Sequence, residues 1–292
     1  MAESFNSFNV ADLRAPDLHR ILLHSVSPRP IAFASTVDKD GNVNLAPFSF
    51  FNTFSINPPL LIFAPNRSGR TGKNKDTVTN ILETFEVVIN TVSFEIVEQC
   101  NLASTEYPKD INEFEKAGLT PIPSMKVKPP RVLESPVQIE CLVKQVISLG
   151  SVGSSGQLIL CEPVWIHIAE RSFTDGVLDP NQLDLVARMG GNFYCRASGQ
   201  SIFELAKPGE KPGIGIDALP DFIKKSHLLT GNELAKLGGL PSLPTRQECE
   251  LFAQQYALKP DLETNFNMAK HFLQKNQPSL AIKALLFLEP YT

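Results

Sequence analysis

The fold is decided by residues 47–77, which contain the segments PFSFFN (47–52), LLIFA (60–64) and NRSGRTGKNKDT (66–77). The first two segments are rich in Phe and Ile, and such residues favour β-strands. The third mixes cations, hydroxyls and glycines. Its Asp76 is a residue type that caps helices, here one expected over residues 77–84. We therefore predict that an aromatic strand end, a polar loop and a helix N-terminus follow one another.

On both sides of this stretch, β-type segments dominate and helices are inserted singly. We expect helices at 16–25 and 94–102 and strands at 31–37, 43–48, 50–54, 60–64, 86–92, 137–149, 157–169, 186–194 and 202–205. Residues 106–130 form a polar, proline-bearing connection. This order predicts a mainly β fold, a β-barrel with inserted helices, rather than a doubly wound sheet.

The pattern changes at KPGEKPG (207–213). Beyond it, apolar residues recur at helical spacing, which predicts helices at 220–225, 232–237, 246–256, 263–275 and 279–288. We therefore expect two domains, a barrel over residues 1–207 and an α-helical C-terminal extension over 208–292. The segment GIGIDA (213–218) matches G-x-G-x-x-A, but it follows this linker and not a strand, so we reject it as a dinucleotide site.

Composition excludes several classes of function. The net charge of −4 argues against nucleic-acid binding, which needs a clustered positive surface. No apolar run approaches the roughly 20 residues of a membrane helix, and the N-terminus is polar, so we expect a cytoplasmic protein without a membrane segment. The histidines and the five scattered cysteines lack the spacing of metal ligands, so no metal site is predicted.

The polar loop is a candidate phosphate site. Arg70 and Lys75 supply charge, Ser68 and Thr77 supply hydroxyls, and Gly69 lets the backbone approach a ligand closely. The following helix directs free amides and a partial positive charge at an anion. A solvated basic surface loop explains the same residues equally well. The spacing is not that of a P-loop.

The aromatic segment could hold the other end of such a ligand. Strict alternation puts Phe48 and Phe50 on one face of a strand and Ser49 and Phe51 on the other. Ser49 and Asn52 could bond the edge of a heteroaromatic ring. Buried core is the stronger interpretation of Phe50 and Phe51 taken alone. Flavin mononucleotide (FMN) has a flat ring at one end and a phosphate at the other, which matches the two segments together.

Linked motifs in this order resemble the flavin reductase-like family with the FMN-binding split-barrel fold. The stretches that carry the resemblance are SPRPIAFAST (27–36), DGNVNLAPFSFFN (40–52), NPP (57–59), KDT (75–77), FEKAGLTP (114–121), PPRVLESP (129–136) and ARMGGNFY (187–194). The match as a whole covers roughly residues 16–206, so the resemblance says little about the C-terminal extension.

The resemblance implies a homodimer with FMN near the subunit interface and places residues around it. Next to the flavin ring it puts Phe48, Ser49, Phe50, Phe51 and Asn52. The phosphate would be held by Ser68, Arg70, Lys75 and Thr77. Gly69 and Asp76 of the same loop also count as cofactor-binding, and Arg29, Asn101 and Ser104 would lie nearby. Arg188 and Tyr194 are the candidate catalytic residues, on the side of the nicotinamide.

The resemblance also implies an activity, an NAD(P)H:flavin oxidoreductase in which NADH or NADPH gives hydride to flavin N5. The electron acceptor would be free flavin, a partner oxygenase or another acceptor. The alternative is a flavoredoxin-like FMN electron carrier that a protein partner reduces and that has no NAD(P)H site of its own. Whether the extension covers the flavin, packs at the dimer edge or docks a partner stays open at this point.

Overall fold

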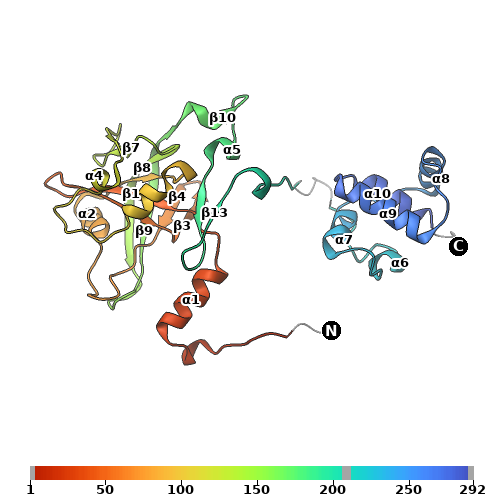
Figure 1. Ribbon diagram of the computed structural model, residues 1–292, viewed down its shortest axis with the longest axis horizontal. Helices are drawn as coiled ribbons and strands as arrows, with labels where there is room; N and C mark the ends of the chain where they lie inside the picture. Colours follow the sequence, from red (N-terminus) through yellow and green to blue (C-terminus); the bar gives the residue numbers. More distant parts are fainter. Residues whose placement is uncertain (1–3, 206–211, 289–292) are drawn as a thin grey trace. The chain divides into compact units, whose positions relative to one another are not determined.

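The computed structural model describes residues 4–205 and 212–288. The chain separates into two compact units, Met1–Phe203 and Glu204–Thr292 (Figure 1). The first contains the strands, and the second contains only helices within its described residues. The domain boundary expected between residues 207 and 208 lies outside the described residues.

One antiparallel sheet of seven strands organises the first unit. Its order is β2 (Val43–Phe48), β1 (Ala32–Val37), β5 (Glu86–Asn90), β8 (Val137–Ser148), β9 (Gln157–Ile168), β4 (Pro59–Phe63) and β3 (Phe51–Ile56). The expected barrel is not closed, because the edge strands β2 and β3 are not paired with each other in the described chain. They are consecutive in sequence, and a bend at Ser49 and Phe50 directs β3 to pair with β4 instead.

The sheet has a core on each face, and β1 contributes to both. All six residues of β1 are buried. Phe33 packs in one cluster with residues of the helical segment 94–102 and of α4 (Glu113–Ala117). Ala32 and Ala34 pack in the other with Ile81 of α2 (Asp76–Thr84). The alternation of side chains along a strand explains this division, and burial on both faces explains the small and apolar residues of β1.

The three helices that the sequence predicts in the first unit are observed, and two short helices, α4 and α5, are added to them. They are α1 (Ala15–Ser25), α2 (Asp76–Thr84), α3 (Val97–Leu102), α4 (Glu113–Ala117) and α5 (Pro180–Leu183), with 3-10 turns at Val10–Asp12, Phe94–Ile96, Glu170–Ser172 and Gly199–Ser201. Helix α4 falls in the connection predicted to be irregular. Helix α2 begins at Asp76 with Lys75 as its N-cap, one residue earlier than expected.

Three two-stranded hairpins complete this unit. They are β6–β7 (Pro121–Ile122, Arg131–Val132), β10–β11 (Phe173–Thr174, Val177–Leu178) and β12–β13 (Val186–Arg188, Tyr194–Arg196). The single strand expected over residues 186–194 is therefore wrong. Gly191 has a φ of 60°, which lets the chain reverse within the motif ARMGGNFY. No strand forms over residues 202–205 either.

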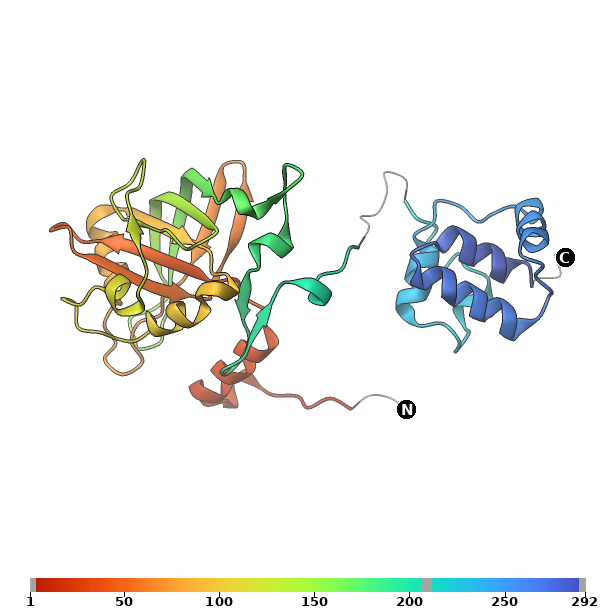
Figure 2. The same cartoon turned by 45° about the horizontal axis from the view of Figure 1, so that its top comes forward.

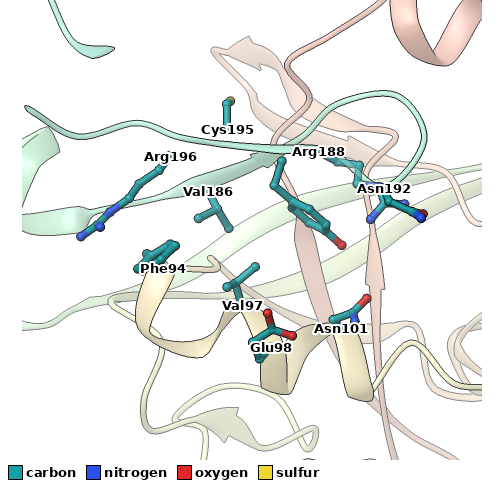
Figure 3. Close-up of a pocket in the computed structure, with 10 residues that line it drawn as sticks. Phe94, Val97, Glu98, Asn101, Val186, Arg188, Asn192, Cys195 and Arg196 are labelled. Atoms are coloured by element: carbon teal, nitrogen blue, oxygen red, sulfur yellow. The ribbon is translucent and has the colours of Figure 1, made fainter. Parts of the chain in front are cut away.

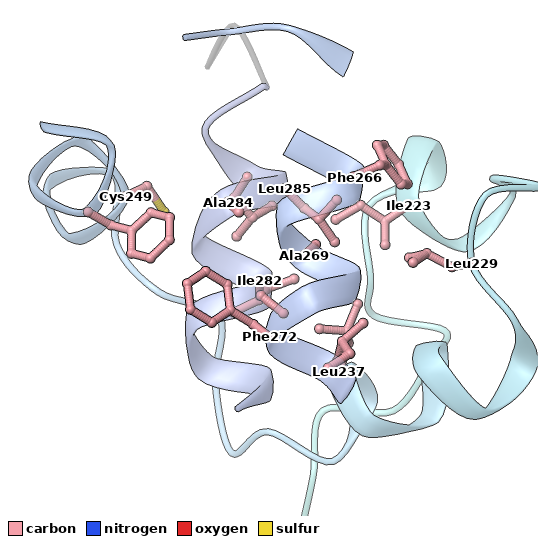
Figure 4. Close-up of a cluster of buried hydrophobic side chains, with 14 of the residues drawn as sticks. Ile223, Leu229, Leu237, Cys249, Phe266, Ala269, Phe272, Ile282, Ala284 and Leu285 are labelled. Atoms are coloured by element: carbon pink, nitrogen blue, oxygen red, sulfur yellow. The ribbon is translucent and has the colours of Figure 1, made fainter. Parts of the chain in front are cut away.

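The second unit has a hydrophobic core of its own. Its helices are α6 (Asp221–Lys224), α7 (Gly231–Gly238), α8 (Arg246–Gln255), α9 (Leu262–Gln274) and α10 (Pro278–Leu286). Leu237, Phe266, Phe272 and Leu285 point into one cluster between these helices (Figure 4). This confirms a helical C-terminal region.

The described helices are all too short or too polar to cross a membrane.

Candidate functional site

Helix α1 and the β12–β13 hairpin lie against each other at one edge of the sheet (Figure 2). Arg29 joins them. Its guanidinium donates to the carbonyls of Leu23 at 2.7 Å and Met189 at 2.9 Å, and its backbone exchanges two hydrogen bonds with that of Arg188. The backbone pairing fixes Arg188 next to Arg29.

The turn between β8 and β9 packs against the polar loop over residues 66–75 and forms hydrogen bonds with it. The backbones of Arg67 and Ser154 are hydrogen bonded, and the Arg67 Nε donates to the Gly150 carbonyl at 3.3 Å. A Cβ atom on Gly153 would lie 3.0 Å from the Gly69 carbonyl oxygen. Only a glycine lets the turn approach the loop this closely.

The aromatic segment adopts a bend and not a continuous strand. Strand β2 ends at Phe48 and β3 begins at Phe51, so Phe48, Ser49 and Phe50 all line the same cleft. Strict alternation does not hold across these residues because the strand ends there. Phe51 packs against the sheet core, and the Asn52 side chain accepts a hydrogen bond from the Thr53 amide at 2.8 Å.

Bend, loop and α1 enclose a cleft of about 420 Å³, which we call the loop cleft. The residues that line it are His19, Leu23, Arg29, Pro47, Phe48, Ser49, Phe50, Ala64, Asn66, Arg67, Ser68, Gly69, Lys75, Glu106 and Arg188. The lining combines aromatic rings with hydroxyl and cationic groups. The cleft can therefore take an anion joined to an apolar ring.

Two further cavities adjoin the loop cleft through shared residues. A bridging cavity of about 190 Å³ lies between Ser49, Asn101, Ser104, Arg188 and Tyr194. A hairpin cavity of about 530 Å³ lies between the helical segment 94–102 and the β12–β13 hairpin. Arg188 lines all three, so the three spaces adjoin one another at this residue.

The walls of the hairpin cavity come from two elements (Figure 3). Phe94, Glu98 and Asn101 face it from the helical segment, and Arg188 and Arg196 belong to the opposite hairpin. Arg196 lies 4.1 Å from the centre of the Phe94 ring, and Arg188 lies 4.5 Å from the centre of the Tyr194 ring. The cavity therefore combines cations with aromatic faces.

The model of the flavin reductase like domain matches residues 24–191, more than half of the chain. The chain belongs to the flavin reductase-like family. An uncharacterized protein of Aquifex aeolicus is 39% identical over 66% of this chain and 96% of its own length.

Two solved structures resemble the first part of the chain. Nitrilotriacetate monooxygenase component B from Bacillus cereus is 32% identical, with a TM-score of 0.65, over 70% of this chain and all of its own. A protein of Shewanella frigidimarina assigned as a flavin reductase with a split barrel domain is 26% identical, with a TM-score of 0.58. The similarity covers 70% of this chain and all of that protein. The first unit therefore has a split-barrel flavin reductase-like fold, although its sheet is not a closed barrel.

Most residues that the sequence predicts for the site of this family line the three cavities. Those that do are Arg29, Phe48, Ser49, Phe50, Ser68, Gly69, Lys75, Asn101, Ser104, Arg188 and Tyr194. The structure does not bring Phe51, Asn52, Arg70, Asp76 or Thr77 to these cavities. Thr77 is buried and its hydroxyl accepts from the Asn44 side chain at 2.9 Å, while Asp76 faces a separate small cavity.

Several lining residues were not found by sequence reasoning. His19 and Leu23 are four residues apart and thus share a face of α1, a signal that spacing could have given. Glu106 belongs to the connection without regular structure, and its place in the cleft is set by tertiary packing alone. Arg196 lies two residues beyond the end of the motif ARMGGNFY (187–194).

The electrostatics of the site favour anions. Burial, and next the charge of Arg188, lower the pKa of Arg29, and the Arg29 Nε is buried without an acceptor among the described residues. The hydrogen bond and charge of Lys75 lower the pKa of Glu106, to which it is paired. Burial raises the pKa of Cys100 to about 12, so this thiol is no nucleophile at neutral pH.

The part of the chain that the structure describes holds no group of three or more His, Cys, Asp or Glu side chains arranged for a metal ion.

Proposed function

We propose that this chain is an FMN-binding oxidoreductase that uses NADH or NADPH to reduce the flavin. The observation that carries the proposal is the junction at Arg188, where a cleft suited to a ring and an anion meets a second cavity with cationic and aromatic walls. A reductase needs two adjacent sites of this kind, one for each partner in the hydride transfer.

The residues of the loop cleft fit FMN. Lys75 and the hydroxyl of Ser68 would hold the phosphate, and Gly69 keeps the loop backbone accessible. Phe48, Ser49 and Phe50 would take the flavin ring. Arg29 lines the same cleft, its Nε has no acceptor among the described residues, and its charge supports an anionic ligand. We propose these residues, and not Thr77 or Asp76, as the cofactor contacts.

The hairpin cavity and the bridging cavity would receive the nicotinamide nucleotide. Arg188 and Arg196 can meet its phosphates, and the Phe94 and Tyr194 rings can meet its flat groups. Arg196 is held by Asp184 through two hydrogen bonds of 2.6 and 2.7 Å, so its guanidinium keeps one orientation. These residues bind and orient the donor.

FMN, when bound, supplies the atom that accepts hydride. The protein therefore needs no general acid or base, and its residues act by position and charge. Arg188 would stabilise negative charge that develops at the junction of the cavities. Its backbone pairing with Arg29, at 2.8 and 3.0 Å, holds it there without reorganisation.

The acceptor of the electrons would be free flavin or a partner oxygenase. The name of the Bacillus cereus protein, a monooxygenase component B, supports the second.

We also propose a homodimer. Phe54 and Ile56 on the edge strand β3 are exposed at 62% and 81% and would be covered by a second copy.

The deciding experiment is the visible spectrum of the purified protein, followed by anaerobic addition of NADH and then of NADPH. Flavin absorbance that bleaches with one nucleotide would support the reductase and identify its donor. A flavin spectrum that neither nucleotide changes would favour an electron carrier. A colourless protein that takes up no added FMN would refute the cofactor assignment.

A further inference from the structure

The loop cleft contains an acid at the place where its cations gather. Among the described residues that line this cleft, four carry a permanent positive charge, and Glu106 is the one carboxylate. Glu106 forms an ion pair with Lys75, and the side chains of the two are 55% and 35% exposed. The pair is therefore reached by solvent and by an entering ligand.

Among the cations that line this cleft, Lys75 is the one best placed to form an ion pair with an entering anion. Two others make hydrogen bonds to protein atoms: the Arg29 guanidinium donates to three backbone carbonyls, and Arg67 donates to Gly150 and to the Asn74 side chain. Arg188 donates to the Gly191 carbonyl and lies over the Tyr194 ring. Lys75, in contrast, bonds the exposed side chain of Glu106.

Building on the proposed function, we infer that Glu106 is a specificity-determining residue that competes with the phosphate of the flavin for Lys75. A phosphate that binds Lys75 must share the ammonium group with Glu106 or displace the carboxylate, and in either case it lies near a carboxylate of like charge. Glu106 thus weakens binding of a phosphate-bearing flavin and leaves a flavin without phosphate unaffected. This makes FMN exchangeable, as a reductase with a diffusible flavin needs.

The test compares FMN with riboflavin, which lacks only the phosphate. Kd for both is measured by flavin fluorescence for the wild type, Glu106→Gln and the control Glu162→Gln. Glu162 pairs with Lys144 at 3.0 Å on the sheet and does not line the cleft. Glu162→Gln therefore changes the net charge as Glu106→Gln does, but at a distance from the cleft. Because solvent screens an exposed ion pair, the loss of the Glu106 charge changes the free energy of FMN binding only modestly. We therefore expect Glu106→Gln to bind FMN about 2- to 5-fold tighter than the wild type.

Three further results are expected. Riboflavin binds Glu106→Gln as it binds the wild type, and Glu162→Gln binds both ligands as the wild type does. In a chain that also carries Lys75→Met, the increase in FMN affinity caused by Glu106→Gln is smaller than in the wild-type background. Added salt reduces the difference in FMN affinity between Glu106→Gln and the wild type, because the competing charges are exposed.

An unchanged Kd for FMN in Glu106→Gln, or an equal change for FMN and riboflavin, would overturn the role of Glu106 and leave the flavin site intact. A wild-type protein that binds neither flavin would instead overturn the proposed function itself. Thermal melting of each variant shows whether the fold is kept.

Discussion

Replacement of Gly190 by Ala tests how the site is assembled from separate elements. Gly190 lies in the turn of the β12–β13 hairpin, directly against the His24 ring of α1. A Cβ atom on Gly190 would lie 2.3 Å from His24 Cγ and 2.5 Å from Nδ1. Carbon atoms pack at about 3.5–4.0 Å, so the ring must move by roughly 1 Å or more.

That movement affects both walls of the site. The His24 Nδ1 lies 2.7 Å from the Arg20 carbonyl and would lose this hydrogen bond, and the hairpin carries Arg188 and Tyr194. Overpacking of this kind costs about 1–3 kcal/mol of stability. A displacement of about 1 Å in a reacting site can lower the rate on the order of 100-fold.

The assay measures melting temperature, flavin content and kcat/KM with the preferred nucleotide. We expect all three to fall in Gly190→Ala and to recover in part when His24→Ala removes the ring from the same chain. Gly231→Ala is the control, since among the described residues nothing beyond its chain neighbours and its own helix backbone lies within 4 Å of the added carbon. Wild-type behaviour of Gly190→Ala, or a double variant no better than the single one, would refute the reasoning.

Three other predictions follow from the packing and charges. Gly153→Ala should displace the loop at Gly69 and weaken FMN binding several-fold without changing riboflavin binding, as fluorescence titration would show; equal losses for both would contradict this. Hydrogen bonds from Asn42 lower the pKa of Asp38 to about 2, so its ionised form stabilises the fold above the unfolded-state pKa of about 3.9 and this contribution is lost as the pH falls towards 2. The difference in melting temperature between wild type and Asp38→Asn should therefore narrow from pH 5 to pH 2.5, and a constant difference would argue against it. Chains 1–203 and 204–292, expressed separately, should each melt cooperatively, with flavin retained by the first; an unfolded fragment would show that the units depend on each other.

Helix positions were predictable because the signals are local. In the second unit the expected helix 246–256 is observed as Arg246–Gln255, and Thr245 and Glu248 form a capping box at its start. The glycines of GIGIDA also have a structural reason. A Cβ atom on Gly213 would lie 2.5 Å from the Gly238 carbonyl oxygen, so the motif serves close packing against α7.

Side-chain directions in the site were less predictable because distant residues decide them. Thr77 follows the polar loop in sequence, but a hydrogen bond with Asn44 turns it into the protein interior. Glu106 and Lys75 are 31 residues apart in the sequence, and no sequence pattern predicts their contact. The bend at Ser49 and Phe50 likewise depends on the pairing of β3 with β4, which the local pattern does not contain.

The position of Arg188 in all three cavities bears on how this protein could diversify. A substitution there alters the environment of every ligand at once, so neither natural selection nor laboratory evolution can adjust one affinity through it alone. His19 and Leu23 line only the loop cleft, whereas Phe94 and Arg196 line only the hairpin cavity. Inherited changes of donor preference should therefore accumulate at the second pair and changes of flavin preference at the first, while the arginine between them stays fixed.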